Sequence, residues 1–217
     1  KRVCVYNIPM TFPAFRVNGI LISSFDAPNT NSNFIYPQNL KQKFLSSFPE
    51  YRFSAHGKFD QYNHSKSKVY LKEVMISLEE KIAVAHWLEQ LEAWDALFIN
   101  VLEVDHLQHF FWSAMNTNQH EFEHAIYQGY KIVDAYIAHL LKRYSKTHAI
   151  MIGSDHGAGE ATQTIYLNYW LEQKGWLHFK KTRLTQLKRA MRSSLLDVER
   201  LTFIASKFKF GSVVSKL

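Results

Sequence analysis

The sequence predicts an α/β fold with parallel strands, and three segments of the chain carry that prediction. Residues 96–102 form a nearly continuous apolar run, which is typical of a strand buried on both faces. Residues 119–143 follow with one apolar stripe at helical spacing, and residues 148–153 form a second short apolar run. A strand, a helix and a strand in this order predict a βαβ unit with a right-handed crossover.

Weaker signals predict the other elements. Residues 1–40 have the composition of loops around one short buried strand at 19–23. Residues 49–70 are polar and predict irregular structure. Ser77 and Glu80 are spaced as in a capping box, so we expect a helix to begin near them.

The composition is that of a folded protein with one substantial domain. The chain has 217 residues, of which 47% are hydrophobic and 21% charged, and this balance argues against disorder. Its single cysteine, Cys4, makes a disulfide framework within the chain impossible. No apolar run reaches the roughly 18 residues of a membrane span, and no signal peptide is visible. We therefore expect no transmembrane segment and a cytoplasmic location.

The net charge of +7 is concentrated at one end of the chain. Residues 180–217 hold ten of the 26 Lys and Arg side chains and only two acidic ones. Such a segment can attract phosphate-bearing partners, or it can be an ordinary solvated helix surface. A nucleic-acid-binding module is an alternative function, but no known motif is present, so we expect no specific nucleic acid partner.

Two acid–histidine groups follow the two apolar runs that were assigned to parallel strands. Asp105 and His109 come after residues 96–102, and Asp155 and His156 come directly after residues 148–153. Because ligands of open α/β sheets bind beyond the carboxyl ends of the strands, both groups are expected at one edge of one sheet. Carboxylate and imidazole ligands suit zinc and also manganese, and two such ions can hold a phosphoryl group. Alternatively, the two aspartates cap the elements that follow them, and the histidines are surface residues.

These motifs resemble those of a known superfamily. The segment Ser154-Asp155-His156-Gly157 resembles the Asp-His-Gly signature of the alkaline phosphatase superfamily, in its nucleotide pyrophosphatase and type I phosphodiesterase-like branch. Asp105 with His109 four residues later resembles the other metal motif of the superfamily. Residues 17–23 also look like a stretch of predicted phosphohydrolases and phosphomutases in this group, and the resemblance covers roughly residues 3–177.

The resemblance implies a three-layer α/β/α fold with a largely parallel sheet, two divalent metal ions (zinc or manganese) and a covalent phospho-enzyme route. Asp105 and His109 would bind one metal, and Asp155 and His156 the other. The implied function is that of a metal-dependent phosphohydrolase of the phosphodiesterase or nucleotide pyrophosphatase kind. Its implied partner is a phosphate-ester small molecule, nucleotides included. The oligomeric state is not indicated.

The same resemblance implies a domain that is incomplete at both ends. Residues 1–179 would be the middle part of an alkaline-phosphatase-like catalytic domain, and residues 180–217 a basic helical cap or insertion. Relatives place the nucleophile upstream of the stretch that matches Lys1, so no catalytic nucleophile is assigned, and Thr11 is rejected because it lies well after that point. A truncated or non-catalytic relative that serves as an interaction domain is the alternative.

Two further histidine arrangements compete with this assignment. Residues 120–124 read His-Glu-x-x-His on the expected helix, which is the pattern of a zinc peptidase with Glu121 as the base. His106, directly after Asp105, can replace His109 as a ligand, although its position favours an outer-shell role.

Overall fold

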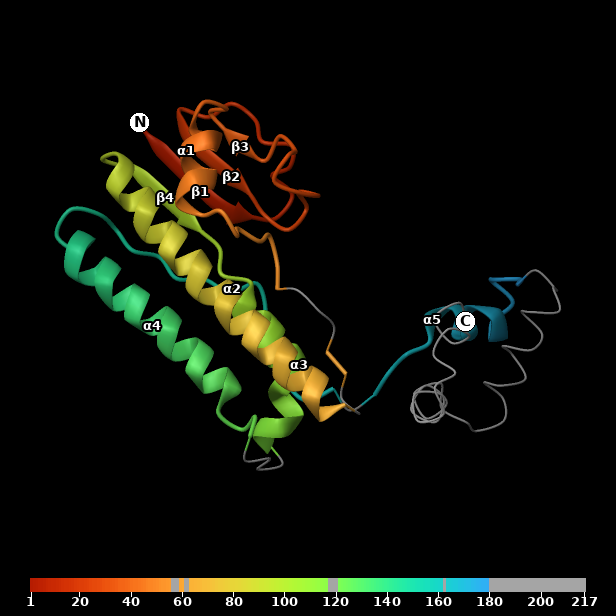
Figure 1. Cartoon of the computed structure of the whole chain (residues 1–217). Coiled ribbons are helices and arrows are strands. Elements are labelled where there is room, and N and C mark those ends of the chain that lie inside the picture. The colour runs from red at the N-terminus through yellow and green to blue at the C-terminus, as the bar shows by residue number, and fades with distance from the viewer. Residues whose placement is uncertain (56–58, 61–62, 117–120, 162, 180–217) are drawn as a thin grey trace. The chain divides into compact units, whose positions relative to one another are not determined.

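The computed structural model describes residues 1–55, 59–60, 63–116, 121–161 and 163–179. The chain divides into two compact units, Lys1–Glu160 and Ala161–Leu217, and each is described by itself. The described part of the first unit contains strands β1 (Val3–Ile8), β2 (Gly19–Ser23), β3 (Ile35–Tyr36) and β4 (Ala96–Ile99), and helices α1 (Leu40–Ser47), α2 (His64–Leu91), α3 (Glu103–Asn116) and α4 (Ala125–Tyr144) (Figure 1). The described part of the second unit contains helix α5 (Leu167–Gln173).

The four strands form one mixed sheet in the order β3-β2-β1-β4. Strand β1 is central and runs parallel to both β2 and β4, whereas the short β3 is antiparallel to β2. The prediction of an α/β fold with a largely parallel sheet is confirmed.

Glycine is required where β2 begins beside β1. Gly19 pairs with Val3 and has a φ of 153°, a backbone conformation that residues with a Cβ rarely adopt. A Cβ atom at this position would lie 1.8 Å from the carbonyl oxygen of Val3. The close approach of the two strands at this end of the sheet therefore depends on the missing side chain.

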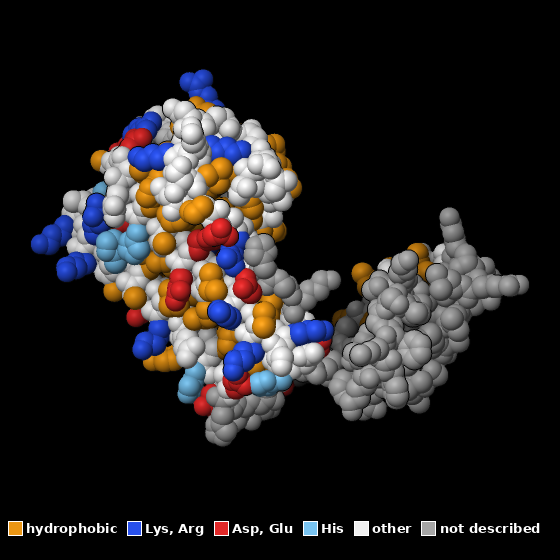
Figure 2. Space-filling view, viewed as in Figure 1, with side chains coloured by type: hydrophobic (Ala, Val, Ile, Leu, Met, Phe, Trp, Pro, Cys, Tyr) orange, Lys and Arg blue, Asp and Glu red, His pale blue; other side chains and the backbone are white. Residues whose placement is uncertain are grey.

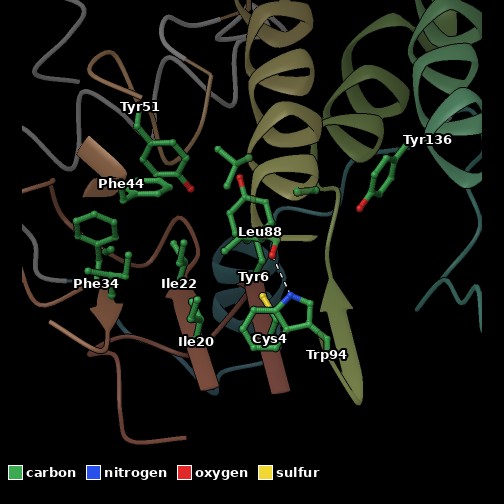
Figure 3. Packing of buried hydrophobic residues seen from close by; sticks show 14 residues of the cluster. Cys4, Tyr6, Ile20, Ile22, Phe34, Phe44, Tyr51, Leu88, Trp94 and Tyr136 are labelled. Atoms are coloured by element: carbon green, nitrogen blue, oxygen red, sulfur yellow. Dashed lines mark hydrogen bonds between the residues drawn. The ribbon is translucent and has the colours of Figure 1, made fainter. Parts of the chain in front are cut away.

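The main hydrophobic core lies between one face of the sheet and the helices. Because the strands are parallel and in register, Cys4, Tyr6, Ile20 and Ile22 point to the same face, and all four are buried. Figure 3 shows side chains from α1, α2 and α4 around them, and the Trp94 indole donates a hydrogen bond to the Leu88 carbonyl oxygen at 2.8 Å. The helical residues buried in this cluster are Phe44, Val84, Ala85, Leu88 and Tyr136.

A second buried cluster joins the lower parts of α2, α3 and α4, which run side by side in Figure 1. Tyr70 and Val74 of α2 pack with Leu107 and Phe111 of α3 and with Ile126 of α4. The helix α2, with 28 residues, is long enough to belong to both clusters. It therefore links the sheet to the helix pair that follows it.

The predicted strand at 148–153 is wrong. These residues have no strand conformation, and Met151 and Ile152 are 94% and 71% exposed. A strand needs the backbone hydrogen bonds of a neighbour, and among the described residues this segment pairs with none of the four strands. The expected βαβ unit of 96–102 and 148–153 is consequently replaced by the parallel pairs β1/β2 and β1/β4.

The strand expected at 96–102 is confirmed for Ala96–Ile99, but its burial on both faces is wrong. Leu97 and Ile99 pack against the main core, whereas Phe98 on the opposite face is 54% exposed. The apolar run alone could not distinguish a strand with one covered face from a strand with two.

Two further boundaries also differ from the expectation. Strand β1 lies where loops were expected, and α2 begins at His64 within the segment expected to be irregular. Asn63 caps α2 by accepting a hydrogen bond from the backbone nitrogen of Lys66, so Ser77 is an interior helix residue rather than a cap.

Two predictions remain, one about the basic segment and one about a membrane span. The basic segment 180–217 lies outside the described residues. Among the helices that the structure describes, none is long and apolar enough to cross a lipid bilayer.

The variant Gly19→Ala is expected to lose more than about 2 kcal/mol of unfolding free energy, because the added Cβ meets backbone rather than a movable side chain. Urea denaturation measures this change. Gly153→Ala is the matched control, since a Cβ there meets nothing within 4 Å, and its effect should stay below about 1 kcal/mol. Equal effects of the two variants would contradict the role of Gly19.

Candidate metal centre

The carboxyl ends of β1 and β4 are joined by two asparagines. The side-chain amide of Asn7 donates to the Asn100 carbonyl oxygen at 2.9 Å, and the amide of Asn100 donates to the Asn7 carbonyl oxygen at 3.1 Å. The Ser24 hydroxyl, which follows β2, donates to Asn7 Oδ1 at 3.0 Å. Asn7 is 1% exposed and has a φ of 59°, which asparagine tolerates better than most residues. Three strand ends are thus fixed at one edge of the sheet.

Helix α3 begins three residues after Asn100, and a buried carboxylate holds its first turn. Glu103 is 2% exposed, and its Oε1 accepts a hydrogen bond from the Ser77 hydroxyl of α2 at 2.8 Å. Lys81 of α2 is also buried, and burial lowers its pKa to about 8, although the charges of Glu103 and Glu80 oppose that shift. The start of α3 is therefore bound to the sheet on one side and to α2 on the other.

The first turn of α3 carries Asp105, and the next turn carries His109. The spacing of four residues places both side chains on one helix face, with His109 Nε2 3.3 Å from Asp105 Oδ1. The negative charge of Asp105 is favourable near the amino end of a helix. The Asp105 side chain is 31% exposed and that of His109 is 64% exposed, so solvent and ligands reach both.

The second acid–histidine group lies beside the first. His156 Nε2 is 3.9 Å from Asp105 Oδ1 and 3.5 Å from Asp155 Oδ2. The Asp105 carboxylate therefore faces two imidazoles, although residues 148–153 form no strand. His156 and Asp155 are 57% and 88% exposed, so this half of the centre is the more open one.

A backbone contact orients the ring of His156. Its Nδ1 lies 2.8 Å from the Gly157 carbonyl oxygen, which can only accept, so Nδ1 carries a proton and Nε2 faces the two carboxylates. The hydrogen bond to Gly157 raises the pKa of His156, and the charges of Asp155 and Asp105 raise it further. This orientation is the one in which an imidazole presents Nε2 to a cation.

The donor types of these four side chains suit a divalent cation, although in the described part of the chain no three of their ligand atoms lie within 4.8 Å of one another. Two carboxylates and two imidazoles are the ligand types of zinc and also suit manganese. Of the expected metal ligands, His109 and His156 both face Oδ1 of Asp105, and Asp155 faces His156.

The structure does not support the peptidase pattern at residues 120–124. His120 lies outside the described residues, and Glu121 to His124 form turns before α4 rather than the expected helix, so the peptidase pattern loses its helical face. Glu121 is instead paired with Lys68 and His64 of α2. The Thr11 hydroxyl donates to the Ile8 carbonyl oxygen at 2.7 Å, which is a structural contact.

His106 is a residue whose role the sequence left open. Its Nδ1 is buried and has no hydrogen-bond partner among the described residues. A buried ring nitrogen of this kind next to Asp105 has capacity for a further partner, so the choice between ligand and outer-shell residue stays a prediction.

The fold and the centre together define an α/β protein of the alkaline-phosphatase-like class. More particularly, the chain belongs to the type I phosphodiesterase / nucleotide pyrophosphatase family, whose model matches residues 13–209. Membership places the chain in a family of phosphoester hydrolases. The matched residues include both acid–histidine groups. No curated protein matches the chain. No solved structure matches it either.

Asn7→Ala is expected to lower the unfolding free energy by about 2–4 kcal/mol, because two side-chain hydrogen bonds vanish and alanine is strained at positive φ. Chemical denaturation followed by circular dichroism measures the loss. Asn31→Ala, at an exposed position, should change the free energy by less than about 0.5 kcal/mol. A small effect at Asn7 would mean that the strand ends are fixed by other contacts.

Proposed function

We propose that the protein is a metal-dependent phosphohydrolase of the phosphodiesterase or nucleotide pyrophosphatase kind. The observation that carries this proposal is the convergence of His109 and His156 on the Asp105 carboxylate at 3.3 and 3.9 Å. Family membership supports the phosphate-ester chemistry. The substrate class is a phosphate-ester small molecule, nucleotides included.

In this proposal the four side chains hold two divalent cations, zinc or manganese. Asp105 and His109 bind one, and Asp155 and His156 bind the other, with Asp105 near enough to His156 to connect the two halves. Bound cations of this kind act as Lewis acids that polarise a phosphoryl oxygen, lower the pKa of an attacking hydroxyl or water and stabilise the leaving oxygen.

The chain's own residues prepare the site for this chemistry. The Gly157 carbonyl keeps the proton of His156 on Nδ1, so that Nε2 remains directed at Asp105 and Asp155. The Ser77–Glu103 hydrogen bond keeps the first turn of α3 in place, and with it the position of Asp105.

The domain division belongs to the same proposal. Residues 1–179 serve as part of the catalytic domain. The segment 180–217 serves as a basic cap or insertion, whose ten Lys and Arg side chains attract phosphate-bearing substrates.

Loss of the shared carboxylate and of one imidazole should remove bound metal. The double variant Asp105→Ala/His156→Ala is expected to bind about two fewer zinc or manganese ions per chain than the unsubstituted protein. Elemental mass spectrometry of the purified chains measures the difference. His64→Ala is a matched control, because His64 is 63% exposed and His109 64%, and His64 pairs with a carboxylate away from the centre. An unchanged metal content in the double variant would overturn the site and favour a non-catalytic interaction domain.

Activity should follow the metal ligands. In the full-length protein, Asp105→Ala or Asp155→Ala is expected to lower kcat/KM for bis(p-nitrophenyl) phosphate about 100-fold or more, since metal stabilisation of the transition state is worth several kcal/mol. Release of p-nitrophenolate measures the rate, and His64→Ala should keep it. If both aspartate variants retain full activity, the proposed function is wrong.

A further inference from the structure

A second group of side chains of the types that can bind a metal lies between α2 and α4, apart from the centre at Asp105. His86 and Glu89 are three residues apart on α2, and Tyr136 and His139 are three residues apart on α4. That spacing places each pair on one face of its helix, and the two faces meet. In Figure 2 a group of pale blue histidine side chains lies at the surface beside α2 and α4.

The carboxylate of Glu89 is the centre of this group. Glu89 is 3% exposed, its Oε2 lies 2.9 Å from His139 Nε2, and its Oε1 lies 3.7 Å from His86 Nδ1. One possible ligand atom from each of the three residues lies within 4.8 Å of the other two. The two imidazole rings are in edge contact, with centroids 4.5 Å apart.

These distances suit a zinc ion. Zinc binds imidazole nitrogen and carboxylate oxygen at about 2.0–2.2 Å in a tetrahedron, which places neighbouring ligand atoms about 3.4 Å apart. The two carboxylate–imidazole distances, 2.9 Å from Oε2 to His139 and 3.7 Å from Oε1 to His86, lie on either side of that value. Because they run to different oxygens, an ion held through one oxygen requires the carboxylate to turn. Two imidazoles and one carboxylate favour zinc over magnesium or calcium, which prefer oxygen ligands alone.

The surroundings of Glu89 provide support for a bound ion. The Tyr136 hydroxyl donates to Glu89 Oε1 at 2.7 Å and so orients the carboxylate, as outer-shell donors do in zinc sites. The His86 and His139 side chains are 38% and 37% exposed, so water has access as a fourth ligand.

One cation already competes for the same carboxylate. Arg143 Nε lies 3.9 Å from Glu89 Oε2, and its side chain is 50% exposed. Because half of that side chain is in solvent, it can turn away when an ion binds. The charge of Arg143 nevertheless weakens binding, which gives the inference a specific test.

We propose that His86, Glu89 and His139 form a zinc site, separate from the centre at Asp105, that joins α2 to α4. The three side chains are the protein ligands, water is the fourth, and Tyr136 positions the carboxylate. Zinc bound there stabilises the packing of α4 on α2, because the ion binds the folded arrangement of the three side chains and not the unfolded chain.

The test uses the whole chain with the Asp105 centre removed. In the Asp105→Ala/His156→Ala background, titration with zinc chloride is expected to show about one ion bound per chain, with an increase in Tm. Adding His86→Ala or His139→Ala should abolish both effects. Cobalt(II) in place of zinc should give the visible absorption of a tetrahedral site in the background variant and lose it in the histidine variants. His64→Ala is the control, because His64 is an exposed histidine that belongs neither to the Asp105 centre nor to the Glu89 group. Adding it to the background variant should leave zinc affinity unchanged.

Two milder variants separate a ligand site from a purely structural network. Tyr136→Phe should weaken zinc binding about 10–100-fold, and Arg143→Ala should strengthen it because the competing cation is gone. Both affinities come from competition with a chromophoric chelator, and circular dichroism without zinc confirms that each variant is folded. Absence of zinc binding in the background variant, or binding that survives both histidine substitutions, would overturn the site. Failure of the Asp105 centre would leave this outcome unchanged, so the two proposals are tested independently.

Discussion

The reciprocal hydrogen bonds between Asn7 and Asn100 are the constraint on which the rest of the first unit depends. They join the ends of the central strand β1 and the strand β4, and Ser24 adds the end of β2. A buried amide can serve in this way because it donates and accepts at once, as Asn7 does through its Nδ2 and Oδ1. The path of the chain into α3, and therefore the place of Asp105, follows from that junction.

Helix α2 supplies the second constraint, because it makes buried polar contacts at two places along its length. Near its middle, Ser77 holds the buried Glu103 at the start of α3. Near its carboxyl end, Glu89 receives hydrogen bonds or ion pairs from Tyr136 and His139 of α4. Each of these buried carboxylates costs desolvation energy. Glu89 has hydroxyl and imidazole partners, whereas Glu103 Oε2 has no hydrogen-bond partner among the described residues. The same helix thereby positions the proposed phosphoester centre and the proposed zinc site.

The sequence indicated the fold class and all four members of the centre, but not how they are brought together. Asp105 and His109 were singled out by their place after an apolar run and by the resemblance, whereas helix α3, which puts them on one face, was not predicted. The approach of His156 to Asp105 was expected from two parallel strands, yet only one of those strands is present. Strand formation at 148–153 depends on a neighbouring edge, which an apolar run does not specify. The group at Glu89 was missed because its two halves are about 50 residues apart and each half alone looks like an ordinary helix surface.

The two halves of the Asp105 centre differ in how firmly the backbone holds them. Asp105 and His109 belong to a helix whose start is tied to buried groups, whereas residues 151–160 are exposed and belong to no strand. Segments of that kind open locally at low free energy. The cation binding proposed for Asp105 would therefore include the entropy cost of ordering the His156 segment, which would consume part of the intrinsic binding energy. Such a centre favours ready exchange of its ion over the tightest retention.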